Sequence, residues 1–299
     1  MVLPLFVCAS VVVIVDPYNL FGVTSVVDNQ VKLKCSSNAY LWKSIEFMNQ
    51  PVDKILLGDS RSEAIDAQYI KQLTGETYYN FACGGATLPD IVRLFWHADK
   101  YSKLKKVYIG LNLDIYNANF KGKTVEEVEA VIDNKLLYLI DKNVTISIYR
   151  ILTKYHQRQV ATDSPKMSKK DFWQHKLGIF TNRVYGNYKY PSEYLVELTK
   201  IADYCNQNNI QLTFLILPTH VDLQTTVRSY QLSDAEQVFR NDLKKLATVF
   251  DFDYDNDLTH NFNNFNDPYH LIDTKPLVNE VWGVKLKYAK VSGGPKLIK

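Results

Sequence analysis

The chain has 299 residues, 46% of them hydrophobic and 22% charged, which is enough for a globular protein with a sizeable core. Its formal net charge is only +3 and it contains no basic stripe, so nothing indicates a nucleic-acid partner. The four cysteines form no CxxC pair, and no spacing of His, Asp or Glu suits a metal site. We interpret the cysteines as free buried thiols, although Cys35 could pair with Cys83 or Cys205 in an exported protein.

The chain starts with an apolar, uncharged run, MVLPLFVCASVVVIV. It is shorter than the roughly 20 residues that a spanning helix needs, and it lacks the positive leader of a signal peptide. It could be the end of a truncated membrane anchor, or a buried strand because it contains VVVIV. We favour the anchor, because the run is terminal and no turn signal precedes it, and we assign residues 1–22 to it.

Further along, short apolar runs alternate with helical patterns. The apolar runs predict strands at 53–58, 76–81, 106–111, 211–217 and 248–253. Apolar residues at helical spacing predict helices at 62–73, 88–101, 193–208 and 233–247. Thr87 is expected to cap the second of these helices. Ser233 and Glu236 are expected to form a capping box at the start of the last one.

Nearly continuous apolar strands that are separated by helices indicate a parallel sheet covered on both faces. We therefore predict a flavodoxin-like, three-layer α/β/α domain over 23–290 with about five parallel strands. The alternation breaks between 117 and 191, where helical patterns occupy 125–140 and 146–156. We interpret this stretch as a helical insertion. The tail 291–299 is expected to be flexible.

Ligands of such sheets bind beyond the carboxyl ends of the strands. The residues there that could contribute to chemistry are Ser60 after the first strand, Gly84 or Gly85 after the second, Asn112 after the third, His220 after the fourth, and Asp267 with His270 after the fifth.

A serine nucleophile needs a base, a group that orients the base, and donors for an oxyanion. Ser60 lies at a strand-to-helix turn, and the DPYHL stretch supplies His270 as base and Asp267 as its orienting carboxylate. The backbone N–H of Gly84, which we choose over Gly85, could hold the oxyanion together with the Asn112 amide. The sequence therefore predicts a serine-based site at this edge.

Each of these residues also has a plain structural interpretation. Ser60 could serve only as a helix cap, and Asn112 could only pin a turn. Arg61 could bind an anionic group of a polymer or pair with a nearby carboxylate. His220 could line the site without acting. The late DxxH motif is what favours a nucleophile at Ser60.

A second DxxH motif, Asp257 to His260, lies in the same loop region. We prefer Asp267 and His270, because LIDTKPLVNEVW follows them with the apolar period of a closing helix. His260 lies among asparagines and is expected to be a solvated loop residue.

This combination resembles the SGNH, or GDSL-like, hydrolase superfamily. The matching blocks are GDS with Ser60, a glycine after the second strand, Asn112 after the third, and the DxxH of Asp267 and His270, in the same order. The resemblance covers most of the chain from residue 53 to 282. The family's third block is commonly GxND, whereas this sequence has GLNLD, which displaces the acid to Asp114. No phosphate loop or dinucleotide fingerprint occurs, so no cofactor is expected.

A narrower resemblance rests on the apolar start, the DPYN of Asp16–Asn19, and LLGDSRS. These features are similar to membrane-anchored SGNH proteins that modify cell-envelope polymers, such as the lipoteichoic-acid D-alanylation and alginate O-acetylation proteins. The resemblance implies acyl transfer or ester hydrolysis, with an O-acetyl group expected, on an extracytoplasmic bacterial glycan. It also implies a membrane-anchored location and a membrane-bound O-acyltransferase as partner.

Two other functions stay open at this point. One is a secreted esterase that acts on small or soluble esters. The other is a non-catalytic scaffold that binds a glycan or an acyltransferase.

Overall fold

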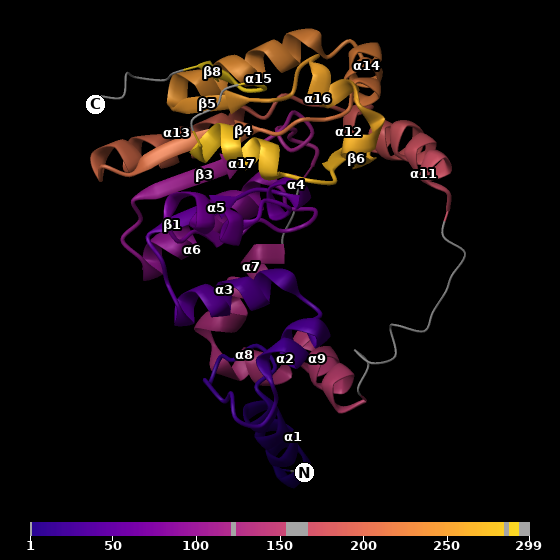
Figure 1. The fold of residues 1–299 in the computed structure, drawn as a ribbon. Helices are drawn as coiled ribbons and strands as arrows, with labels where there is room; N and C mark the ends of the chain where they lie inside the picture. The colour runs from indigo at the N-terminus through magenta and orange to yellow at the C-terminus, as the bar shows by residue number, and fades with distance from the viewer. Residues whose placement is uncertain (1, 121–123, 154–166, 284–286, 293–299) are drawn as a thin grey trace. The chain divides into compact units, whose positions relative to one another are not determined.

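The computed structural model describes residues 2–120, 124–153, 167–283 and 287–292. Its contacts divide the chain into two compact units (Figure 1). Unit 1 combines Met1–Pro51 with Lys123–Lys166, and unit 2 combines Val52–Gly122 with Met167–Lys299. This division differs from the one expected from sequence, because residues 23–51 group with the helical segment and residues 167–191 belong with the sheet.

Unit 2 contains a six-stranded sheet. Its strands are β1 (Lys54–Leu57), β2 (Tyr79–Asn80), β3 (Lys106–Gly110), β4 (Gln211–Ile216), β5 (Thr248–Asp251) and β8 (Lys290–Ser292). The order is β2-β1-β3-β4-β5-β8, with five parallel strands and an antiparallel β8 at the edge. Helices flank this sheet, which confirms the predicted three-layer α/β/α fold and its flavodoxin-like order.

The remaining elements of unit 2 follow in chain order. They are α4 (Ser60–Glu63), α5 (Ala67–Thr74), α6 (Leu88–Tyr101), α11 (Lys169–His175), the π-helical turn η2 (Lys176–Phe180), α12 (Thr181–Tyr185), α13 (Ser192–Gln207), α14 (Val221–Ser229), α15 (Ser233–Leu246), α16 (Asp257–His260), the 3-10 turn η3 (Phe262–Asn264), a hairpin of β6 (Phe265–Asp267) and β7 (His270–Leu271), and α17 (Lys275–Trp282).

Strands β1, β3 and β4 are buried almost throughout, because helices cover both faces of the sheet. Successive side chains point to opposite faces. Leu56, Tyr108 and Leu215 form one cluster with Ile70 of α5 and Val278 of α17. On the other face α6, α13 and α15 pack against β1, β4 and β5. In register, the carboxyl ends of β1, β3 and β4 reach the same edge.

The helix expected at 62–73 is broken into α4 and α5. Asp66 caps α5 by accepting hydrogen bonds from the backbone N–H groups of Gln68 and Tyr69. The Asn80 amide donates to the backbone oxygens of Ser62 and Ile65, which fixes the break. The predicted helix is therefore interrupted at 64–66, where the Asp66 and Asn80 side chains satisfy backbone groups.

The two predicted helix caps have different outcomes. Thr87 forms a capping box with Asp90 at the start of α6, so the predicted cap is confirmed. The capping box expected at α15 is wrong. Leu232 occupies the cap position there, and the Glu236 carboxylate pairs with Arg240 instead.

The tail expected to be flexible over 291–299 contributes in part to the sheet. Val291 and Ser292 belong to β8, where Val291 lies opposite Phe250 of β5. That part of the expectation is wrong, because β5 offers an edge for pairing. Residues 293–299 lie outside the described residues.

Unit 1 is helical. Its described elements are α1 (Val2–Val15), α2 (Asn29–Cys35), α3 (Ala39–Asn49), α7 (Thr124–Asp133), α8 (Lys135–Ile140) and α9 (Lys142–Leu152). The apolar start is thus a helix, and its interpretation as a buried strand is wrong. A search of the described helices finds none with the length and apolar character needed to cross a membrane.

None of the four cysteines forms a disulfide; Cys8 is exposed and the other three are buried. The two disulfides considered from the sequence, from Cys35 to Cys83 or to Cys205, are therefore not formed. In the well-packed interior the three buried thiols behave as small apolar side chains.

The DPYN stretch, which follows α1, forms hydrogen bonds with α8 and α9. Asp16 accepts hydrogen bonds from the backbone N–H groups of Phe21 and Val23 and from the Tyr138 hydroxyl of α8. The Tyr18 hydroxyl lies 2.9 Å from the Ser147 hydroxyl of α9. In this chain, the motif therefore has a structural role.

Candidate active site

Ser60 is the first residue of α4, immediately after the turn that leaves β1. Asp59 caps this short helix by accepting a hydrogen bond from the Arg61 N–H at 3.0 Å. Gly58 has a φ of +145°, and a Cβ there would collide with the Ser62 side chain and come within 3.0 Å of the Gly110 oxygen. The sharp turn therefore requires glycine.

Ser60 lies within hydrogen-bond distance of His270. The Ser60 Oγ is 2.7 Å from His270 Nε2. The other ring nitrogen, Nδ1, is 2.8 and 2.9 Å from the two carboxylate oxygens of Asp267. Because Nδ1–H donates to the carboxylate, Nε2 is left with the lone pair that can accept the serine proton.

The charge state of Asp267 suits the role of an orienting carboxylate. Burial alone would raise the pKa of Asp267, but the hydrogen bond and charge of His270 and the backbone N–H of Tyr269 lower that pKa below its usual range. Asp267 is therefore an anion at neutral pH and can stabilise an imidazolium on His270.

The β6–β7 hairpin brings the carboxylate and the imidazole together. Asp267 and His270 face each other across the hairpin, with Pro268 and Tyr269 in the turn. The Tyr269 hydroxyl lies 2.8 Å from the Thr181 hydroxyl of α12, which attaches the turn to the rest of unit 2. The spacing of three residues in DPYH thus follows from a two-residue turn.

Of the two glycines after β2, Gly84 is the one beside Ser60. A Cβ on Gly84 would lie 3.9 Å from the Ser60 Cβ, whereas one on Gly85 would meet no heavy atom within 4 Å. Gly85 has a φ of +76° in a turn closed by the Ala86 N–H and the Cys83 oxygen at 3.0 Å. Gly85 therefore supports the turn, and Gly84 offers its backbone near the serine.

Asn112 is buried and connects the ends of β3 and β4. Its Nδ2 donates to the Leu217 oxygen at 2.7 Å, and its Oδ1 accepts from the Leu217 N–H at 3.3 Å. This contact is the pinning role considered from sequence. Within the described part of the chain, the second hydrogen of its amide has no partner.

Arg61 is buried between two carboxylates. Its Nε and Nη2 donate to Asp59 Oδ2 at 2.9 and 2.6 Å, and Nη2 also donates to both Asp114 oxygens at 2.8 Å. Burial alone would lower the pKa of Arg61, but Asp114 and Asp59 raise it well above the usual value. The structure thus shows the carboxylate pairing of Arg61, and Asp114, the displaced acid of GLNLD, completes it.

His220 is buried and lies at the start of α14. Its Nδ1 accepts a hydrogen bond from the Asp222 N–H at 3.1 Å, and its ring packs edge-on against Trp173 and Phe265. Burial lowers the pKa of His220, which keeps the ring neutral. Its backbone N–H donates to the Pro268 oxygen at 2.9 Å, so His220 helps to hold the β6–β7 hairpin in place.

The second DxxH motif has a different arrangement. His260 Nε2 lies 2.5 Å from Asp255 Oδ1, and both side chains are more than half exposed. Asp257, the acid of that motif, is the first residue of α16. The structure therefore brings His270, and not His260, to Ser60.

Two features of this site escaped the sequence analysis. One is the identity of the two carboxylates, Asp59 and Asp114, that pair with Arg61. The other is the fit of the Ser62 side chain against Gly58 and Gly110, which lets α4 approach β1 and β3 closely. The signal in the sequence for this close approach is Gly58 after β1 and Gly110 at the end of β3. Among the described residues, no three His, Cys, Asp or Glu side chains gather to hold a metal ion.

No protein-family model matches the chain, and no curated protein matches it in sequence. Similar solved structures include a proposed platelet activating factor from Streptococcus pneumonia, at 13% identity and a TM-score of 0.41, covering 85% of this chain and 92% of that one. Another is a proposed acylhydrolase from Bacteroides fragilis, at 10% identity and a TM-score of 0.36, covering 77% and 84%.

Proposed function

We propose that the protein is a serine-dependent enzyme that cleaves or transfers esters through an acyl-Ser60 intermediate. The observation that carries this proposal is the continuous hydrogen-bonded series from Ser60 Oγ through His270 to Asp267, with distances of 2.7 and 2.8 Å. Such a series activates a serine that would otherwise be a weak nucleophile.

The reaction has two halves. Ser60 Oγ attacks the ester carbonyl while His270 Nε2 takes its proton, and Asp267 stabilises the imidazolium. The tetrahedral oxyanion is held by the backbone N–H groups of Ser60 and Gly84 and by the unused amide hydrogen of Asn112. The imidazolium then protonates the leaving alcohol, and acyl-Ser60 remains.

In the second half an acceptor hydroxyl, from water or from a sugar, gives its proton to His270 and attacks the acyl carbonyl. The second tetrahedral intermediate collapses, the bond to Ser60 breaks, and His270 returns the proton to Ser60 Oγ.

The transferred group is a short acyl group, expected to be acetyl. The resemblance of the GDS and DPYHL motifs supports this part of the proposal. A small cavity lies beside His270, and its mostly apolar walls include Leu217, Pro218, Leu271 and Leu277.

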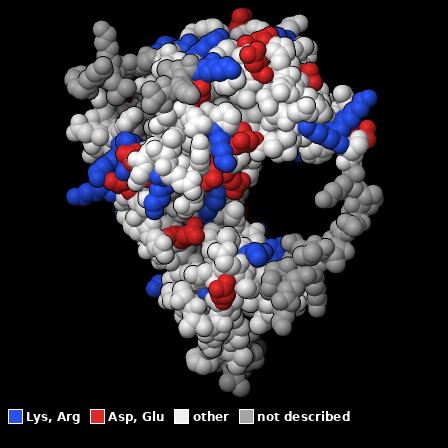
Figure 2. All heavy atoms as spheres, in the orientation of Figure 1, with Lys and Arg blue, Asp and Glu red and all other residues white. Residues whose placement is uncertain are grey.

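We further propose that the ester belongs to a bacterial cell-envelope glycan at the outer face of a membrane. The apolar start and the DPYN and GDS motifs support this location by resemblance, as they do an acyltransferase partner. Helix α1 adds support, because Phe6 is 69% and Ile14 53% exposed and the visible face of α1 carries no charged side chain (Figure 2). Exposed apolar surface of this kind marks a contact with lipid or protein.

A hydrolysis assay with p-nitrophenyl acetate, run with and without an O-acetylatable oligosaccharide, tests this function. The wild-type protein should release p-nitrophenol, and Ser60→Ala should reduce the rate to background. Faster release together with acetylated oligosaccharide identifies a transferase, whereas acetate alone identifies an esterase. Equal rates for wild type and Ser60→Ala would contradict the catalytic role and favour a scaffold.

A further inference from the structure

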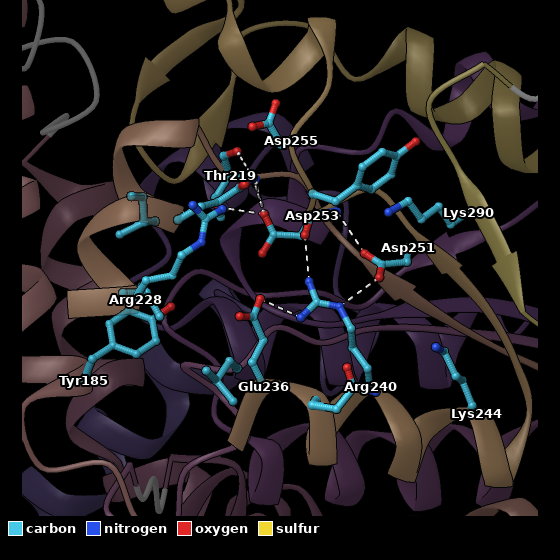
Figure 3. A pocket seen from close by; sticks show the side chains of 16 residues that line it. Tyr185, Thr219, Arg228, Glu236, Arg240, Lys244, Asp251, Asp253, Asp255 and Lys290 are labelled. Atoms are coloured by element: carbon cyan, nitrogen blue, oxygen red, sulfur yellow. Dashed lines mark hydrogen bonds and ion pairs between the residues drawn. The ribbon is translucent and has the colours of Figure 1, made fainter. Parts of the chain in front are cut away.

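A second, polar pocket of about 380 Å³ opens in unit 2 beyond the carboxyl end of β5 (Figure 3). Helices α14 and α15, the loop after β5 and the edge strand β8 supply its walls. Thr219 lines this pocket, and its neighbour Pro218 lines the small cavity beside His270. The loop after β4 thus separates the two cavities, and the pocket is distinct from the proposed catalytic site.

The carboxyl group of Asp253 lies at the centre of this pocket with one oxygen engaged and one available. Oδ1 accepts hydrogen bonds from the N–H and the hydroxyl of Thr219, at 2.9 and 2.6 Å, and from the Gln224 amide at 3.2 Å. Oδ2 has no hydrogen-bond partner among the described residues and points into the pocket (Figure 3). It can therefore bond to a ligand.

The other acids of the pocket have partners within the wall. Arg240 donates from Nε to Asp251 at 2.9 Å, pairs through Nη1 with Glu236 at 2.5 Å, and donates from Nη2 to the Asp253 backbone oxygen at 2.6 Å. Asp255 pairs with His260. These carboxylates therefore have bonding partners, although the single charge of Arg240 is shared between Asp251 and Glu236.

Three cations of the wall are not compensated in this way. Arg228 of α14, Lys244 of α15 and Lys290 of β8 form no ion pair or hydrogen bond with the described residues. Lys290 lies 3.7 Å from the centre of the Tyr254 ring. Three positive groups from three separate elements are therefore available to bond to an anionic group that enters the pocket.

We propose that this pocket binds a phosphate or carboxylate group carried by a hydroxylated ligand. Arg228, Lys244 and Lys290 contact the anionic group, and Asp253 Oδ2 accepts a hydrogen bond from a ligand hydroxyl. The guanidinium supplies a planar pair of donors that fits either oxyanion. This binding does not require Ser60, so it is separate from the proposed catalysis.

Acid strengthens this binding. Burial, opposed by the Thr219 hydrogen bonds and the charge of Arg240, raises the pKa of Asp253 to about 6. As the pH falls through this value, Asp253 loses the charge that repels an anion. The other charged groups around it are Arg228, Lys244 and Lys290, the paired Arg240, Glu236 and Asp251, and Asp255 with His260. Asp253→Asn isolates the contribution of Asp253.

Calorimetric titration of the full chain tests the proposal with three probes: inorganic phosphate, glucuronate and glucose. Phosphate or glucuronate should bind, and Arg228→Gln and Lys244→Gln should each weaken that binding at least fivefold. Lys245→Gln is the matched control, because Lys245 is the next residue of α15, pairs with Asp242 and does not line the pocket. Ser60→Ala should bind like the wild type.

The arms of the experiment separate the sources of the anion. Binding of phosphate alone identifies a phosphorylated ligand, and binding of glucuronate alone identifies a carboxylated sugar; both support the site. Glucose binding as tightly as glucuronate, no binding of either anion, or equal weakening by Lys245→Gln would overturn it.

Discussion

At the scale of single residues, the tautomer of His270 decides whether Ser60 can act. Asp267 accepts a hydrogen bond from Nδ1–H, so the lone pair of Nε2 faces the Ser60 hydroxyl. Asp267→Asn would reverse this arrangement, because an amide donates to Nδ1 and the proton moves to Nε2. We expect kcat for ester hydrolysis to fall about 10³- to 10⁴-fold with little change in Tm, as measured by steady-state kinetics and thermal unfolding.

Asp257→Asn serves as the control, since Asp257 belongs to the DxxH motif that does not reach Ser60. Its kcat should equal that of the wild type. A decrease of less than tenfold in Asp267→Asn would show that Asp267 does not orient the base.

Gly58 is the second residue whose identity is determined by the site. A Cβ there would collide with the Ser62 side chain, and the φ of +145° is unfavourable for any other residue. We expect Gly58→Ala to lower the free energy of unfolding by about 2 kcal/mol or more, measured by urea denaturation. Gly178→Ala is the control, because a Cβ there meets nothing within 4 Å. Equal stability of the two variants would contradict the close packing at Gly58.

Asp253 gives a pH-dependent prediction for stability. Its folded pKa, about 6, is raised above the ordinary value of 3.8. The wild type therefore loses stability as the pH rises from about 3.8, where the unfolded chain ionises, and the loss is complete above about 6. Asp253→Asn removes that loss. We expect the variant to gain, relative to the wild type, about 1.4 kcal/mol between pH 5 and pH 8, measured by chemical denaturation at both values. The same difference at both pH values would contradict the raised pKa.

The residues of the candidate site differ in how far the sequence could predict them. Ser60 and the pair of Asp267 and His270 lie in two short contiguous motifs, GDS and DPYHL, so residue type and order were sufficient. The pairing of Arg61 with Asp114 was not predictable, because it joins positions 53 residues apart through side-chain conformations that the sequence does not specify.

At the scale of elements, α8 and α9 have unusually apolar outer faces. Leu136 and Ile140 of α8 are 71% and 75% exposed, and Tyr149 and Leu152 of α9 are each 65% exposed. Both helices contact α1 within unit 1. On the proposed location of the protein at a membrane, we expect this apolar surface to contact the lipid.

The double variant Leu136→Glu with Ile140→Glu should reduce binding to phosphatidylglycerol vesicles at least tenfold, because each leucine-sized side chain gains about 1.5–3 kcal/mol on burial. Vesicle co-sedimentation of the full chain measures this. Val196→Glu is the control, since Val196 is an exposed apolar residue of α13 in unit 2. Unchanged sedimentation of the double variant would exclude α8 from the membrane contact. The apolar surface of α8 would then be expected to bind a protein.

The elements also show where sequence patterns are sufficient. Helix α6 has the bounds expected from its cap and its apolar period, because both signals are local. The break between α4 and α5 depends on the Asn80 amide, which arrives from the next strand. β8 depends on a free edge of β5, so neither feature has a local signal.

At the scale of the whole molecule, the chain forms two units that each combine distant segments. In unit 1, the Asp16 carboxylate and the Tyr138 hydroxyl join residues 122 apart in the chain. The alternation of strands and helices was sufficient to predict the sheet of unit 2. It also predicted the edge of that sheet at which the candidate site residues lie. The helical segments lack such alternation, so their pairing into a second unit depended on contacts that only the structure shows.

The central claim is that Ser60 is a nucleophile activated by His270. Labelling of the full chain with a fluorophosphonate, followed by peptide mass mapping, tests it most directly. We predict a single adduct on Ser60, lost in His270→Ala and retained in His260→Ala, whose imidazole pairs with Asp255 away from the serine. An adduct on another residue, or labelling of Ser60 that is equal in both histidine variants, would contradict the account.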